Sequence, residues 1–493
     1  MDWHTWLPLL EATDYTIARE VLLRGVAAVY FIAFLGAWNQ FPALLGEHGL
    51  NPAPAYIERT DARDKPSLFR WRFTPYSDRL LRLVCLVGMI LSLTVVAGII
   101  QLGPGWLTIP VFLIMWWFYL SIVNIGQYYY GFGWESLLLE AGFIVGFLGT
   151  PDVAPPMLIL LFLRWTLFRV EFGAGMIKMR GDKAWRDLTA MNYHHQTQPM
   201  PNPISRWAHQ KPQWWHKSET LGSHIIQLVM PWLIFFPQPI ASIAAVVIMM
   251  SQLVLVMTGN YAWLNWLTIL IAFSAISDSF LHALVGGEWP AWGWEHVVSV
   301  FNDEGQTQSP VWWLVATAVV FFGLCLLSWL PLRNLFSEHQ LMNASFNRWH
   351  LVNAYGAFGA MTQVRRELII EGTMSSDPST ETGWQAYEFK GKPGDVYRRP
   401  PQVAPYHLRL DWMMWFLALG SPNQPWFRRL LGKLLDGDPA IRKLLRHDPF
   451  GGQPPVLIRV KIFEYRYATR AERRETGQWW IRKELGTIVP PTG

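Results

Sequence analysis

Three ionisable residues, Arg164, Glu171 and Lys178, follow one another at intervals of seven within a largely apolar stretch of the chain. Seven residues of α-helix leave successive members offset by only about 20°, so the three share one face. A charged side chain at the centre of a bilayer costs at least about 2.5–3.5 kcal/mol. We therefore expect this face to point into the protein.

Glu135 and Glu140, on the preceding apolar run, are the expected counter-ions, and Arg169 belongs to the same group. Ionisable groups within a membrane often mark functional sites, so one interpretation is a substrate or cofactor pocket. The other is a structural ion-pair cluster that fixes the register of the helices. Gly173 and Gly175 are expected to let neighbouring helices approach closely.

We call Arg164, Glu171 and Lys178 the stripe. The segment that follows this stripe is polar, aromatic and stiff. WRDLTAMNYHH (185–195) predicts a short interfacial helix, and QPMPNP (198–203) predicts an extended segment because each proline restricts its own φ and its predecessor. Such a loop suits a lid or a docking surface, although it could also be a solvated connector. Its candidate binding residues are Asp182, Trp185, Arg186, Asp187, His194, His195, Gln198, Pro199, Pro201 and Asn202.

Adjacent histidines point apart on either a helix or a strand. His194 and His195 therefore have poor geometry for sharing a metal ion, and we predict no metal site in this chain. Cys85 and Cys325 both lie in apolar runs, without a CxxC pair, which excludes dithiol exchange by this chain alone. The GxSxG, GxxxxGK[ST] and HExxH signatures are also absent from the sequence.

Composition places these residues in a membrane protein. Hydrophobic residues make up 51% of the chain and charged residues only 16%, against about a quarter in soluble proteins. Basic residues are not clustered with exposed aromatics, so nucleic acid is not an expected partner, whereas membrane lipids are. Apolar runs of about 20 residues predict nine spans, or eight. They lie near 21–42, 83–102, 106–128, 134–149, 156–177, 222–236, 240–258, 262–282 and 311–331.

The chain is therefore predicted to be a polytopic α-helical membrane protein with a C-terminal soluble α+β domain. We place the membrane domain at 1–335, including the 169–203 loop, and the soluble domain at 336–493. Alternating patterns predict a small mixed sheet. The strands are expected within 362–373, 383–391, 456–469 and 479–489, and helices within 408–419, 426–437 and 440–448.

Charge placement predicts which loops share one side of the membrane. Loops 47–82 and 177–218 each hold seven Lys or Arg, whereas the connection 279–310 holds none and contains four acidic residues. With nine spans, both basic loops and the C-terminal domain fall on one side. The positive-inside rule favours the cytoplasm for that side.

The stretch FGAGMIKMRGDKAWRDLTAMNYHHQTQPMPNP (172–203) resembles the central signature of the lipase maturation factor family. Further blocks resemble the family in order at 258–268, 351–373, 387–416 and 477–486. The resemblance implies a multi-pass membrane protein that assists, as a chaperone, the maturation of exported lipases. It implies the endoplasmic-reticulum membrane in a eukaryote and the inner membrane in a bacterium, with the C-terminal domain facing the compartment of the clients.

The membrane part is more distantly similar to the vitamin K-dependent γ-carboxylase, whose catalytic base is a lysine shortly after an Ala-Gly pair. Ala174-Gly175 precedes Lys178 in the corresponding place. This likeness implies an alternative: a membrane enzyme with Lys178 as its base and a bound lipid or quinone as cofactor. Desolvation would favour the neutral amine that a base requires, while Glu171 would oppose it. The leading hypothesis is a factor that works by binding.

Overall fold

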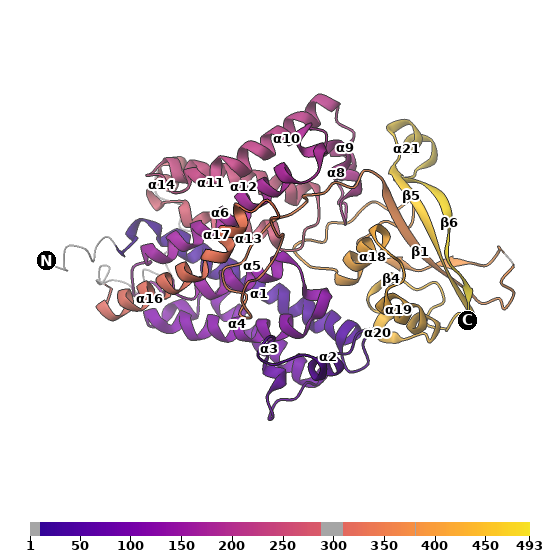
Figure 1. The fold of residues 1–493 in the computed structure, drawn as a ribbon, viewed down its shortest axis with the longest axis horizontal. Coiled ribbons are helices and arrows are strands. Elements are labelled where there is room, and N and C mark those ends of the chain that lie inside the picture. The colour runs from indigo at the N-terminus through magenta and orange to yellow at the C-terminus, as the bar shows by residue number, and fades with distance from the viewer. Residues whose placement is uncertain (1–9, 287–308, 380) are drawn as a thin grey trace.

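The computed structural model describes residues 10–286, 309–379 and 381–493. Figure 1 shows a helical region at one end of the molecule and a β-sheet at the other. Three helices lie between them: α18 (Arg409–Leu419), α19 (Pro425–Leu435) and α20 (Pro439–Arg442). The C-terminal third therefore joins the helical region through a helical layer.

Helix α1 (Thr16–Leu45) is the central element of the helical region. Its 30 residues extend about 45 Å, and apolar side chains are buried on several of its faces. It packs against α3 (Asp78–Val96), α5 (Gly133–Val145) and α13 (Leu264–Ala272). A helix that is apolar on all faces is stable only where neighbouring helices or lipid cover it, and neighbouring helices cover much of α1.

The other helices surround this centre. α6 (Met157–Arg180) contacts α5, α13 and α10 (Gln213–Leu228), and α12 (Ile240–Thr258) packs on α13. The remaining α-helices of the described residues are α2 (Ala53–Arg59), α4 (Thr108–Ile125), α7 (Lys183–Arg186), α8 (Met191–Thr197), α9 (Ser205–His209), α11 (Met230–Leu233), α14 (Asp278–Val285), α16 (Val311–Leu327), α17 (Trp329–Leu335) and α21 (Arg470–Thr476).

Membrane-spanning helices are fewer than the sequence predicts. Within the described residues, four helical stretches are long and apolar enough to span: Thr13–Leu45, Asp78–Val96, Gly105–Ile125 and Ile240–Thr258. Two bent pairs, α13 with α14 and α16 with α17, raise the number to six if each pair is one span. The protein is thus a membrane protein with four to six candidate spans, and the predicted eight or nine are not confirmed.

Three predicted runs are not among the candidate spans, each for a physical reason. Helix α5 has 13 residues, about 20 Å, which is shorter than the roughly 30 Å hydrocarbon core of a bilayer. Helix α6 has 24 residues but carries several buried ionisable groups. The run 222–236 is divided between α10 and α11, where Pro231 begins a new helical turn. An apolar run in the sequence therefore did not always form a single helix that is long and apolar enough to be a candidate span.

The C-terminal sheet has the strand order β2-β1-β5-β6. Its strands are β1 (Arg365–Thr373), β2 (Gln385–Ala386), β5 (Leu457–Tyr467) and β6 (Trp480–Thr492), and every pairing is antiparallel, so the predicted mixed sheet is corrected. A second ribbon pairs β3 (Glu388–Phe389) with β4 (Leu445–His447). The helix predicted at 440–448 ends at Arg442 because β4 takes up the following residues.

Both basic loops contact the C-terminal region. Arg348 donates to the carbonyl of Arg63 at 3.0 Å, and Arg429 donates to the carbonyl of Leu50 at 2.8 Å. From the second loop, Arg206 donates to the carbonyl of Ala468 at 2.9 Å. These contacts put the two loops and the C-terminal region on one side of the molecule. The acidic connection lies mostly within 287–308, outside the described residues.

Candidate functional site

Helix α6 holds its charged side chains inside the protein. Arg164, Glu171 and Lys178 are 5%, 1% and 7% exposed. The neighbouring helices α5, α10 and α13 cover this helix, so the charges face protein atoms. The helix starts after Pro156 and ends at Arg180, and the chain enters the loop at Gly181.

A cavity of about 300 Å³ lies beside the second half of α6. Glu171 and Lys178 line it, and so do Trp185, Met191 and His194 from the loop that follows. Further lining residues are His195 and Glu219 together with apolar residues of α10, α12 and the 355–358 segment, among them Ile226, Leu255 and Phe358. The loop predicted as a lid therefore contributes part of the cavity wall.

Lys178 meets polar groups of α10. Its Nζ donates to Ser223 Oγ at 3.1 Å and to Gln227 Oε1 at 2.9 Å, and it lies 4.3 Å from the centre of the Trp185 ring. Glu171 accepts a hydrogen bond from Gln252 Nε2 at 2.6 Å. Its second carboxylate oxygen has no hydrogen-bond partner among the described residues. The cavity thus combines apolar walls with an ammonium and a carboxylate.

Arg164 is not one of the residues that line this cavity. Its Nε donates to the carbonyl of Ser274 at 3.0 Å, and its guanidinium lies 5.3 Å from the centre of the Tyr15 ring. Of the three residues of the stripe, Glu171 and Lys178 therefore face the cavity, whereas Arg164 links α6 to the 273–276 turn.

Glu140 is not the counter-ion of the stripe, which corrects the sequence prediction. It forms a salt bridge with Arg169 in which both side chains are 0% exposed. Its Oε2 also accepts hydrogen bonds from the backbone N–H of Asn353 at 2.8 Å and from the Tyr355 hydroxyl at 2.8 Å. The pair therefore fastens the 353–355 segment to α5 and α6. Sequence spacing could not show this because Asn353 is 213 residues from Glu140.

Glu135 also has a partner from the C-terminal region rather than from the stripe. Arg409 Nη1 lies 2.7 Å from Glu135 Oε1, and Tyr119 donates its hydroxyl proton to the other oxygen. His407 Nδ1 lies 3.4 Å from the same Oε1. Burial and the neighbouring Arg409 lower the pKa of His407 to about 4, so its imidazole is neutral at physiological pH.

Small residues let the 353–359 segment cross over α6. A Cβ added to Gly173 would lie 2.4 Å from the carbonyl oxygen of Tyr355, and one added to Gly181 would lie 2.2 Å from that of Gly359. Gly175 instead faces Leu228 of α10, the helix–helix contact that the sequence predicts. At Gly173 the close approach is made to an irregular segment.

Hydrogen bonds to Asp182 and from Trp185 fix the first part of the loop. Asp182 accepts the N–H of Ala184 at 2.9 Å and that of Met361 at 3.1 Å, and these hydrogen bonds lower its pKa. Trp185 is buried and donates its ring N–H to the carbonyl of Phe358 at 2.7 Å. Arg186 and Asp187 are exposed. Of the four candidate residues in this part of the loop, only Arg186 and Asp187 have exposed side chains, and the exposed Lys183 lies 3.7 Å from Asp187.

The second part of the loop is not a docking surface, which corrects the sequence prediction. Six candidate residues are buried: His194, His195, Gln198, Pro199, Pro201 and Asn202. Arg365 of β1 donates to the carbonyls of Gln196 and Pro199 at 2.9 and 3.0 Å. Asn260 donates to the carbonyl of Pro201 at 3.2 Å. The stiff segment is therefore a packed joint between the helical region and the sheet.

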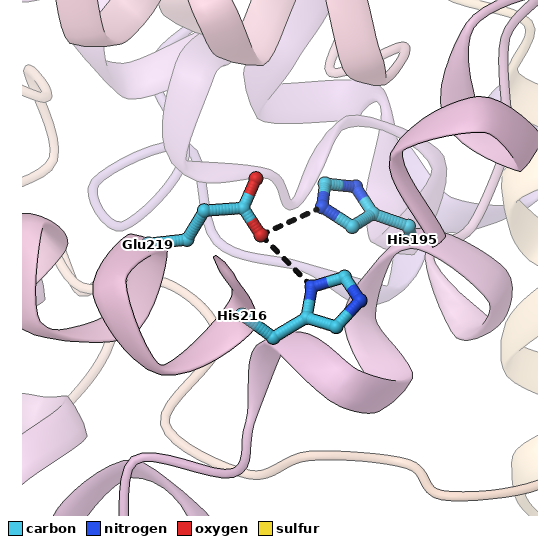
Figure 2. Close-up of side chains that lie close together, drawn as sticks. All are labelled: His195, His216 and Glu219. Carbon is cyan, nitrogen blue, oxygen red and sulfur yellow. Dashed lines mark hydrogen bonds and ion pairs between the residues drawn. The ribbon is translucent and has the colours of Figure 1, made fainter. Parts of the chain in front are cut away.

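The adjacent histidines have different partners. His194 Nε2 lies 2.9 Å from the Tyr261 hydroxyl, and burial together with His195 lowers the pKa of His194 to about 3. His195 instead meets two residues of α10, His216 and Glu219, as Figure 2 shows. The three ligand-type atoms lie within 4.8 Å of one another. Sequence reasoning missed this group, although His216 and Glu219 lie three residues apart and share a helix face.

Two family models match the chain. A family model described as the Lipase maturation factor transmembrane domain matches residues 17–283, and one described as the Lipase maturation factor C-terminal domain matches residues 351–490. No solved structure matches the chain. The family models thus cover the helical region and the sheet separately.

Curated relatives match along nearly the whole chain. Lipase maturation factor 1 of Mus musculus is 38% identical over 508 residues, which cover 98% of this chain and 88% of the relative. Its Homo sapiens counterpart is 38% identical, with 98% and 89% covered. Lipase maturation factor 2 of Gallus gallus is 29% identical, with 96% and 81% covered. This chain therefore belongs to the lipase maturation factor family.

Proposed function

We propose that this protein is a membrane-embedded maturation factor that assists the folding and assembly of exported lipases by binding them. One observation carries the proposal: the similarity to proteins named lipase maturation factors spans both the helical region and the C-terminal region. The relatives of this chain are named lipase maturation factors, so the carboxylase-like alternative gains no support.

The client surface is proposed to include exposed side chains of the 352–373 and 387–411 segments. Val364 is 43% exposed and Tyr397 is 59% exposed, although both are apolar or aromatic. Exposed Arg186 and Asp187 add charges from the 182–203 loop. Partly unfolded clients expose apolar surface, and aromatic side chains commonly supply binding energy to such surfaces.

The experiment is co-expression with a secreted dimeric lipase in cells that lack their own maturation factor. We expect this protein to raise the active fraction of secreted lipase, and Val364→Ser with Tyr397→Ser to reduce that gain by about tenfold, equivalent to about 1.4 kcal/mol of binding. Val456→Ser is the matched control because Val456 is 42% exposed but lies outside both segments. Lys178→Ala should have a mild effect. No gain with a folded, membrane-inserted protein would refute the proposal.

We propose that the C-terminal region faces the compartment in which the clients fold. That compartment is the lumen if the membrane is that of the endoplasmic reticulum, or the periplasm if it is a bacterial inner membrane. A reporter that is active on only one side of the membrane, fused after Gly493, tests this orientation. Activity on the cytoplasmic side would contradict it.

We also propose that the cavity beside α6 holds a lipid or a quinone. Its apolar walls suit a hydrophobic body, while Lys178 and Glu171 could bind a polar head group. Mass spectrometry of the molecules that the purified protein retains tests this proposal directly. Lys178→Ala should release the molecule and Lys178→Arg should retain it, and retention by both variants would exclude a role for the charge.

A further inference from the structure

The group formed by His195, His216 and Glu219 lies between two elements that the chain brings together. His195 belongs to α8, whereas His216 and Glu219 lie one helical turn apart on α10. The two histidines are 1% and 3% exposed. Figure 2 shows both imidazoles directed at the same carboxylate.

Distances within the group match a shared coordination sphere. His216 Nδ1 lies 3.0 Å and His195 Nε2 lies 3.5 Å from the same oxygen, Glu219 Oε2. Ligands at about 2.0–2.1 Å from a tetrahedral zinc ion are about 3.4 Å apart. The two observed distances lie on either side of that value, and all three ligand atoms lie within 4.8 Å of one another, so rotation of the side chains would admit an ion.

The tautomer of His216 is set by a backbone contact. Its Nε2 lies 3.2 Å from the carbonyl oxygen of His209, and a carbonyl oxygen can only accept, so Nε2 carries the proton. Neutral His216 therefore directs a bare Nδ1 lone pair at the Glu219 carboxylate. Two acceptors 3.0 Å apart repel unless a cation lies between them, either a second proton or a metal ion. A backbone carbonyl that orients a metal-binding imidazole in this way is a common second-layer contact.

We propose that His195, His216 and Glu219 bind a zinc ion that ties α8 to α10. Two histidines and one carboxylate form a known zinc ligand set, which leaves the fourth position for water or another ligand. His195 and Glu219 also line the cavity. The fourth position is therefore on the side from which water, or an anionic oxygen of a bound molecule, can reach the ion. This site holds the loop against α10 and does not depend on the identity of the clients.

The test measures zinc in the purified full-length protein, prepared in detergent with an affinity tag that contains no histidine. We expect about one zinc per chain, and zinc binding at least about tenfold weaker after Glu219→Gln or His216→Gln. His209→Gln is the matched control, because it removes a nearby imidazole and keeps the backbone carbonyl that orients His216. It should retain the metal. Magnesium, which prefers oxygen ligands, should not compete.

A second measurement uses only the unaltered protein and the His209→Gln variant, in case the ligand variants do not fold. Removal of zinc with a chelator should lower the thermal unfolding midpoint, and added zinc should restore it. Cobalt in place of zinc should give the visible absorption of a four-coordinate site. Folded protein that binds no zinc would overturn the proposal, as would zinc bound equally well by all variants.

Discussion

The buried pair of Glu140 and Arg169 gives the sharpest test of the fold. The Glu140 carboxylate accepts hydrogen bonds from Arg169, from Asn353 and from Tyr355, and neither side chain of the pair is exposed. Removing one partner leaves the other charge buried without compensation, at a cost of about 3–5 kcal/mol. We expect Glu140→Gln to destabilise the protein by this amount and to loosen the 353–355 segment.

A double-mutant cycle separates the pair from its surroundings. The Glu140→Gln and Arg169→Met single variants and the double variant are compared by chemical unfolding in detergent, and we expect a coupling free energy of about 1–3 kcal/mol. Asp187→Asn is the control: its pair with Lys183 spans 3.7 Å, with side chains 50% and 79% exposed, and should contribute less than about 1 kcal/mol. Additive single effects, or a Glu140→Gln effect as small as the control, would refute the reasoning.

Three further predictions concern other parts of the structure. Gly181→Ala should lower the free energy of unfolding by about 1–3 kcal/mol because its Cβ would meet the Gly359 carbonyl, whereas Gly222→Ala, with nothing within 4 Å, should be neutral or stabilising in calorimetry. The pKa of His407 is lowered to about 4 in the folded protein, whereas an unfolded histidine has a pKa of about 6.5. As the pH is lowered from about 6.5 to about 4, the unfolded chain therefore takes up the His407 proton first, and the free energy of unfolding should fall by up to about 1.4 kcal/mol per pH unit. His407→Gln should flatten that slope in pH-dependent unfolding, and an unchanged slope would contradict the assignment. Asp182→Ala should cost about 1–2 kcal/mol through loss of the cap, and Asp182→Asn clearly less, in the same assay.

Local patterns predicted some features of the fold well. The heptad spacing of Arg164, Glu171 and Lys178 is a property of a single helix, and the structure places all three inside the protein. Strands β1, β5 and β6 lie where the alternation of apolar and polar residues in the sequence predicts strands. Hydropathy could not separate a spanning helix from one buried by other helices, and α5 is the clearest example, because most of its residues are covered by protein.

Partners across long distances were the part that local patterns could not predict. Arg409 reaches Glu135 from the C-terminal region, so a search restricted to neighbouring spans assigned the wrong counter-ions. The same holds for the loop, where Arg365 and Asn260 bury residues that the sequence alone made look accessible. His195 meets Glu219 only because α8 folds back on α10.

The dependence of Glu135 and Glu140 on later residues has a consequence for biosynthesis. Both carboxylates belong to α5, which the ribosome completes long before Asn353 and Arg409 are made. Until those residues are made, Glu135 lacks Arg409 and Glu140 has Arg169 but not Asn353, so the nascent membrane bundle lacks part of its charge compensation. We expect a chain that terminates before residue 351 to keep every candidate span of the described residues but to be less stable, because Glu135 would stay buried without its arginine.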